Sequence, residues 1–177
     1  MKKKLWRQKR KRLVLLCDVS GSMVQFSEFA LRFIQSLNRV SEDSRVFLFS
    51  EGIHEADAFC LQNMDRFRSY VRETKLYGRG TDLGLALEKL NAMKPSVLNP
   101  SVTLLILSDT KTTGQQRALK ALAESKRRSG QVLILNPIPH RKWKYLQSTR
   151  AFAGAVNMVS CATLQELAEA CRKLVIK

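Results

Sequence analysis

Short apolar runs alternate with amphipathic segments along most of the chain. Leu13 to Cys17 and Val102 to Leu107 are continuous apolar runs, the pattern expected for strands that are buried on both faces. After the first run, apolar residues recur every three or four positions, as on a helix with one buried face: Phe26, Phe29, Ala30, Phe33, Ile34, Leu37 and Val40. Strands that alternate with helices favour a parallel sheet covered on both faces. We therefore predict an α/β fold with a Rossmann-like, doubly wound sheet and helices on both faces.

The same patterns predict six strands. Besides the two runs above, strands are expected at 45–50, 53–60, 132–135 and 155–160, and helices around 64–72, 83–93, 118–123 and 163–175. Only Glu51 and Gly52 separate the second and third strands, which is short enough for a hairpin. The sheet is thus expected to be mostly parallel, with one antiparallel edge strand. Gly130 is expected to follow a helix C-cap, and Thr163 with Glu166 to form a capping box.

The charge of the chain is concentrated at its beginning. Lys and Arg number 31 against 15 acidic residues, and eight of these cations lie in residues 1–12. A charge block of this kind is usually a solvated arm, so we expect an arm or linker at 1–12 and one domain at 13–177. No segment resembles a membrane span or a secretory leader, and the four cysteines are scattered in the pattern of reduced thiols. We expect a cytoplasmic protein.

Polar residues follow two of the expected strands and precede one helix. Asp18-Val19-Ser20-Gly21-Ser22 directly follows the first strand, and Ser108-Asp109 directly follows the strand at 102–107. Thr81 lies on the loop before the helix at 83–93. If the two strands are neighbours in the sheet, all three segments meet above its carboxyl edge. They would supply carboxylate and hydroxyl oxygens only, a set suited to a hard divalent cation, and to Mg²⁺ more than to zinc.

This arrangement resembles the metal-ion-dependent adhesion site of von Willebrand factor type A (VWA) domains. In that family an Asp-x-Ser-x-Ser motif follows the first strand, a Thr precedes a helix and an Asp follows the fourth strand. The resemblance implies that the metal is held by Asp18, Ser20, Ser22, Thr81 and Asp109, with Thr81 direct or through water and Asp109 through water. One position departs from the family pattern, because Thr110 stands where Gly is common after the last Asp.

Several longer segments resemble the bacterial CoxE-like branch of the family. They are Leu-Cys-Asp-Val-Ser-Gly-Ser-Met, Arg-Val-Phe-Leu-Phe, Gly-Thr-Asp-Leu-Gly-Leu-Ala-Leu and Val-Leu-Ile-Leu-Asn-Pro. Proteins of that branch often carry the domain behind a helical region and a basic linker, which residues 1–12 resemble. The resemblance implies a docking module in which Mg²⁺ (or Mn²⁺ or Ca²⁺) accepts an Asp or Glu carboxylate of a protein partner. It also implies a MoxR-type AAA+ ATPase as co-worker in protein maturation or remodelling.

Two other function classes compete with this interpretation. The basic arm and further Lys and Arg residues leave binding to nucleic acid or to an anionic surface open, although no nucleic-acid-binding motif is present. A metal-dependent phosphoesterase of the haloacid dehalogenase kind needs an acid two positions after the first Asp, where this chain has Ser20. No P-loop or hydrolase elbow occurs, and His54 and His140 are expected to be structural or solvent-exposed. We therefore do not expect an enzyme.

Overall fold

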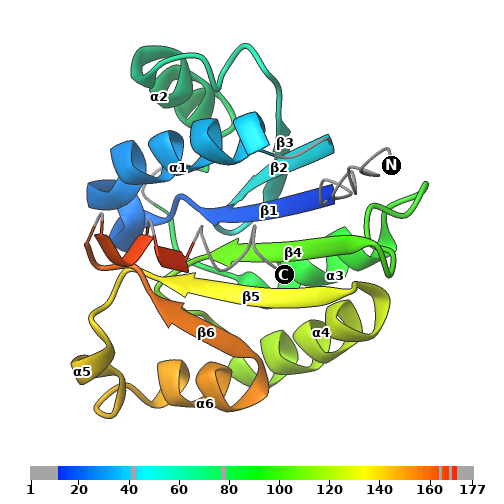
Figure 1. Cartoon of the computed structure of the whole chain (residues 1–177), viewed down its shortest axis with the longest axis vertical. Coiled ribbons are helices and arrows are strands. Elements are labelled where there is room, and N and C mark those ends of the chain that lie inside the picture. The colour runs from blue at the N-terminus through cyan, green and yellow to red at the C-terminus, as the bar shows by residue number, and fades with distance from the viewer. Residues whose placement is uncertain (1–11, 41–42, 77–78, 164, 168, 171–177) are drawn as a thin grey trace, which may run out of the picture.

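A six-stranded sheet in the order β3-β2-β1-β4-β5-β6 forms the centre of the computed structural model (Figure 1). The structure describes residues 12–40, 43–76, 79–163, 165–167 and 169–170. The strands are β1 (Arg12–Asp18), β2 (Asp43–Phe49), β3 (Ile53–Ala56), β4 (Val102–Leu107), β5 (Gln131–Asn136) and β6 (Asn157–Ser160). All neighbouring strands are parallel except β2 and β3, which form an antiparallel hairpin at one edge. The predicted fold class, including the antiparallel edge strand, is confirmed.

Helices cover both faces of the sheet. They are the 3-10 helix η1 (Gly21–Phe26), then α1 (Ser27–Val40), α2 (Met64–Glu73), α3 (Leu83–Ala92), α4 (Gln115–Arg128), α5 (His140–Trp143) and α6 (Gln147–Ala155). In Figure 1, α1 and α2 lie on one side of the sheet and α3, α4 and α6 on the other. No described helix has both the length and the apolar character needed to cross a membrane.

Two hydrophobic cores lie between the sheet and its helices. Side chains of successive strand residues point to opposite faces, so β1 contributes to both cores. Leu13, Leu15 and Cys17 pack on the side of α1 and α2, and Val14 and Leu16 on the side of α3, α4 and α6. The interior residues of β1 and β4 are buried throughout, which explains their continuous apolar runs.

Some elements differ from the sequence-based prediction. Strand β3 ends at Ala56 rather than at residue 60, because the Asp57 side chain accepts a hydrogen bond from the backbone N–H of Cys60 at 2.7 Å and closes a turn. Helix α6 was not predicted, and Ala155 belongs to it rather than to the last strand. Its buried residues are Thr149 and Phe152, too few to produce a helical apolar repeat.

Two predicted helix ends are accounted for by specific contacts. Gly130 follows the C-cap residue of α4, Ser129, and a Cβ at Gly130 would lie 2.2 Å from the carbonyl oxygen of Pro100. Glycine is therefore required there by close approach of two backbone segments. The Thr163 hydroxyl accepts a hydrogen bond from the backbone N–H of Glu166 at 3.1 Å, as predicted for a capping box. Residues 164, 168 and 171–175 of the predicted last helix, and residues 1–11 of the predicted arm, lie outside the described residues.

Candidate metal centre

The carboxyl ends of β1 and β4 lie side by side. The two strands pair in parallel register, with Cys17 opposite Leu107, so Asp18 and Ser108 leave the sheet at the same edge. Strand β2 pairs with β1 on its other side. The strands that follow β1 in the sequence therefore lie on both sides of it, first β2 and β3 on one side and then β4, β5 and β6 on the other. Ligand sites in open α/β sheets form at this kind of switch point. The segments of Asp18 and Asp109 therefore lie at the same edge of the sheet, as expected.

Asp18 is the most constrained carboxylate of this edge. It is 2% exposed, and its Oδ1 accepts a hydrogen bond from the backbone N–H of Ser20 at 3.0 Å. Its Oδ2 accepts a hydrogen bond from the Ser108 hydroxyl at 2.7 Å. The pKa of Asp18 is raised to about 6, mainly by burial; hydrogen bonds from Ser20 and Ser108 offset part of this rise, and the charge of Asp109 adds to it. A cation beside this carboxylate would relieve the cost of its burial.

The Ser20 hydroxyl is buried and makes no hydrogen bond to a described residue. Ser20 is 1% exposed, and its Oγ has no hydrogen-bond partner among the described residues. Such an orphaned polar atom costs free energy unless a water or an ion completes it. Ser22, the second serine of the motif, is half-buried in η1. The loop therefore holds a buried oxygen that is available as a ligand.

Thr81 lies between the two loops that carry the aspartates. The carbonyl oxygen of Arg79 accepts a hydrogen bond from the backbone N–H of Gly21 at 3.1 Å, which holds the 79–81 segment against the first loop. The carbonyl oxygen of Thr81 accepts one from the backbone N–H of Thr113 at 2.9 Å, which holds it against the loop after β4. The three segments predicted to meet are thus joined by backbone hydrogen bonds.

Asp109 is buried but paired with a cation. Its side chain is 3% exposed, and its Oδ2 lies 3.1 Å from the Lys111 ammonium, whose side chain is 58% exposed. Its Oδ1 accepts a hydrogen bond from the backbone N–H of Lys111 at 3.0 Å. The short turn from Asp109 to Lys111 therefore provides its own counter-ion.

Thr110, the departure from the family pattern, adopts a backbone conformation that favours glycine. Its φ is +62°, and it is fully buried. Its hydroxyl lies 2.6 Å from the carbonyl oxygen of Asp109 and 3.0 Å from the hydroxyl of Thr149 in α6, and the Asn136 amide donates to it at 3.4 Å. The Ser148 hydroxyl donates to the carbonyl oxygen of Thr110. The left-handed turn is thus retained without glycine because a buried polar network holds the threonine.

Asp82, next to Thr81, has a structural role. It is the N-cap of α3, where its Oδ1 accepts a hydrogen bond from the backbone N–H of Leu85 at 2.8 Å. Its Oδ2 accepts one from the Arg117 guanidinium. Burial acts to raise the pKa of Asp82, but these two hydrogen bonds outweigh it and hold the pKa below its usual range. This carboxylate is committed to helix capping and an ion pair.

The donor set fits a hard divalent cation. No group of three or more His, Cys, Asp and Glu side chains suited to a metal occurs in the described part of the chain. The edge instead combines the carboxylates of Asp18 and Asp109 with hydroxyls, of which that of Ser20 lacks a partner. Oxygen donors of this kind match Mg²⁺, Mn²⁺ or Ca²⁺ better than zinc. That Asp18, Ser20, Ser22, Thr81 and Asp109 bind a metal stays a prediction.

Sequence reasoning assigned no role to three further residues of this edge. Ser108 fixes the orientation of Asp18, Lys111 pairs with Asp109, and Ser50, directly after β2, holds a second buried hydroxyl without a partner among the described residues. Ser50 and Ser108 both follow strands whose carboxyl ends lie beside that of β1. Position at a strand end is the signal that identifies such residues.

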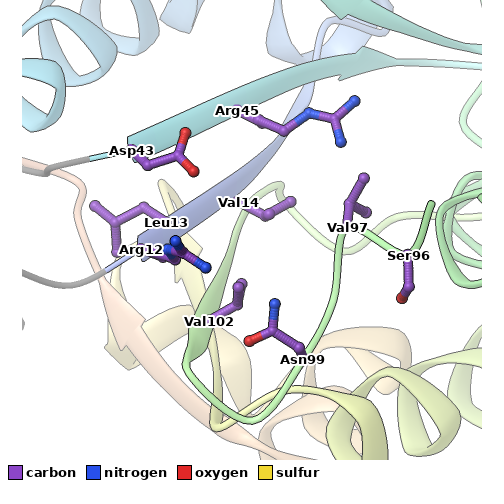
Figure 2. A pocket seen from close by; sticks show the side chains of 9 residues that line it. All are labelled: Arg12, Leu13, Val14, Asp43, Arg45, Ser96, Val97, Asn99 and Val102. Atoms are coloured by element: carbon purple, nitrogen blue, oxygen red, sulfur yellow. The ribbon is translucent and has the colours of Figure 1, made fainter.

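A pocket of about 160 Å³ lies at the opposite ends of the strands (Figure 2). Arg12, Asp43 and Val102, which begin β1, β2 and β4, line it together with Arg45. The Arg45 guanidinium is bound by both carboxylate oxygens of Glu55 at 2.7 Å. The arginine that lines this pocket is thus already paired, and the pocket lies apart from the candidate metal centre. The two histidines, His54 in β3 and His140 in α5, are both exposed.

Comparison with solved structures shows the fold. A von Willebrand factor type A protein of Catenulispora acidiphila superposes with a TM-score of 0.61 at 15% identity, over 96% of this chain and 42% of that chain. The manganese-loaded TRAP protein of Plasmodium vivax gives 0.58 at 18% identity, over 96% of this chain and 72% of that chain. Proximal thread matrix protein 1 of the mussel byssus gives 0.60 at 18% identity, over 94% and 47%. The chain thus spans less than half of the Catenulispora and mussel proteins.

No curated protein matches the sequence. The family described as VWA domain containing CoxE-like protein matches it over residues 2–172, nearly the whole length. This match agrees with the sheet order, the antiparallel edge and the oxygen-rich edge described above. The chain belongs to the family of VWA domain containing CoxE-like proteins.

Proposed function

We propose that this chain is a metal-dependent docking module, in which a divalent cation at the β1/β4 edge is completed by a carboxylate of a protein partner. Asp18, Ser20, Ser22, Thr81 and Asp109 would hold the cation, Mg²⁺ first and Mn²⁺ or Ca²⁺ as alternatives. The observation that carries the proposal is the buried Ser20 hydroxyl without a described partner, beside the buried Asp18 carboxylate. VWA domains typically serve as metal-dependent protein-interaction modules and are generally not enzymes.

The charges at this edge favour docking of an anion. Two aspartates contribute, and one of them is already paired with Lys111. A divalent cation held there keeps part of its charge, so an incoming Asp or Glu gains more than a neutral group. Asp82, the nearest further acid in the sequence, is engaged with Arg117 and the α3 N-terminus. The site therefore lacks a free acid next to Thr81 that would serve as a general acid or base.

The partner follows from the family resemblance, and the compartment from the scattered cysteines. We propose a MoxR-type AAA+ ATPase as co-worker in maturation or remodelling of another protein, in the cytoplasm, with residues 1–11 as a basic linker. Cys17 and Cys60 are buried free thiols, which supports a reducing compartment.

Metal dependence of partner binding tests the proposal. Titration of a co-expressed AAA+ ATPase onto the immobilised chain should show binding that is lost in EDTA and restored by Mg²⁺. Thr81→Ala should weaken it about tenfold to a hundredfold, since charge-assisted contacts contribute about 1.5–3 kcal/mol. Thr74→Ala, at the C-cap of α2, is the matched control and should leave it unchanged. If neither EDTA nor Thr81→Ala changes the binding affinity, the proposal of a metal-dependent docking module is wrong.

Binding to nucleic acid or to an anionic surface is the second candidate. Arg68, Arg72, Lys75 and Arg79 are exposed on and after α2, and residues 1–12 add further cations. Such binding would fall steeply with salt and lose strength on removal of residues 1–11, without regard to metal. Phosphoester substrates should remain uncleaved in the presence of Mg²⁺ under either proposal.

A further inference from the structure

Lys111 occupies an unusual position relative to the proposed metal centre. It lies two residues after Asp109, and its ammonium is 3.1 Å from Asp109 Oδ2 while most of its side chain is exposed to solvent. The backbone N–H of the same lysine donates to the other oxygen of that carboxylate at 3.0 Å. Both oxygens of Asp109 are therefore occupied by one residue.

This pairing has a physical cause. Asp109 is 2% exposed, and a buried carboxylate is costly unless a cation or hydrogen bonds compensate it. The charge of Asp109 also raises the pKa of Asp18, so the two carboxylates repel each other. The Lys111 ammonium thus reduces repulsion between two acids at one edge of the sheet, as a bound divalent cation would.

We propose that Lys111 is an internal counter-ion that competes with the divalent cation for Asp109 and so lowers the metal affinity of the site. The inference rests on the proposed metal centre and adds the residue that tunes it. An ammonium 3.1 Å from Oδ2 and a divalent cation held by the same carboxylate repel each other, so metal binding weakens the Lys111–Asp109 ion pair. The exposed stem of the lysine allows this without disturbing the core, and the lysine thereby makes metal binding weaker and more readily reversed.

Calorimetric titration of Mn²⁺ and Mg²⁺ into Lys111→Met tests the inference. Methionine keeps an unbranched apolar stem and removes the ammonium. The loss of one partly exposed competitor should tighten metal binding by about threefold to tenfold. The matched control is Lys89→Met in α3, which removes the same charge from an exposed lysine of another element and should change the affinity by less than about twofold. The advantage of Lys111→Met over the wild type should shrink in high salt, because salt screens the exposed ammonium.

Thermal melting provides a readout that does not depend on the partner. In EDTA, Lys111→Met should melt below the wild type because Asp109 loses its counter-ion, whereas saturating Mn²⁺ should raise its melting temperature more than that of the wild type. Equal or weaker metal binding by Lys111→Met than by Lys89→Met would overturn the role of Lys111 and leave the metal centre standing. If the wild type, Lys111→Met and Asp18→Ala all fail to bind metal, the metal centre and the inference both fall.

Discussion

The left-handed backbone of Thr110 leads to a stability prediction that differs from that for an ordinary position. At an ordinary helical position alanine is more stabilising than glycine, by about 1 kcal/mol. Thr110 has φ +62°, which costs a residue with a Cβ about 1–2 kcal/mol, and glycine avoids this cost. Glycine in turn loses about 0.4–1 kcal/mol through its freer unfolded chain and about 0.8 kcal/mol through the missing buried Cβ. Thr110→Gly should therefore be about as stable as Thr110→Ala, instead of less stable by about 1 kcal/mol.

The native threonine should nonetheless be more stable than either variant. Both lose the hydroxyl that contacts Thr149 and the carbonyl oxygen of Asp109, and both lose a buried methyl group. One hydrogen bond contributes about 1 kcal/mol and a buried methyl about 0.8 kcal/mol. Thr110→Ala and Thr110→Gly are thus each expected to cost about 2 kcal/mol.

The network can be weakened from its other end. Thr149→Val in α6 removes the hydroxyl partner at nearly constant shape, while the Thr110 hydroxyl can still donate to the carbonyl oxygen of Asp109. We expect a loss of about 1 kcal/mol, or about 2–4 °C in melting temperature for a domain of this size.

Thermal and urea unfolding in EDTA measure these differences without a contribution from metal. The control pair is Lys120→Ala and Lys120→Gly at an exposed position inside α4, where glycine should be the less stable variant by about 1 kcal/mol. If Thr110→Gly is less stable than Thr110→Ala by about 1 kcal/mol, as in the control pair, the strain argument is wrong. If Thr149→Val unfolds like the wild type, the hydroxyl network does not stabilise the loop.

Three further predictions concern the proposed site and the rest of the chain. Asp18→Ala should abolish Mg²⁺ and Mn²⁺ binding in calorimetry while circular dichroism shows the sheet retained; unchanged affinity would contradict the assignment. Deleting residues 1–11 should leave the melting temperature and metal affinity nearly unchanged, and a large loss of stability would show that this segment packs on the domain. Asp82→Asn should destabilise the domain at pH 7, and the difference from the wild type should vanish in acid. The reason is that the lowered pKa of Asp82 makes its stabilisation present above its ordinary value of 3.8 and lost as the pH falls through the folded-state value. A difference that persists well below that pH would refute this role.

The local elements could be predicted from the sequence because short-range patterns dictate them. Strand β4 begins and ends where the apolar run at 102–107 does, and the Glu51-Gly52 hairpin makes β3 antiparallel as expected. The strand ends also place Asp18 and Asp109 at one edge once a parallel sheet is assumed. Periodicity thus predicts that these two segments meet, whereas the resemblance to VWA domains supplied the full set of five candidate ligands.

Only the tertiary structure decided how those side chains are paired. Asp18 is oriented by Ser108, 90 positions away in the chain, and Thr110 is held by Thr149, 39 positions away. No periodicity relates such partners. The pairing of β1 with β4 brings Asp18 to Ser108, and the position of α6 beside the loop after β4 brings Thr149 to Thr110. The folded loops also leave the Ser20 hydroxyl buried without a described partner, and the turn at 109–111 places the Lys111 ammonium on Asp109. Residue order determined which oxygens reach this edge, and packing determined which of them remain free to bind a cation, because hydrogen bonds and ion pairs depend on distances that only the folded chain establishes.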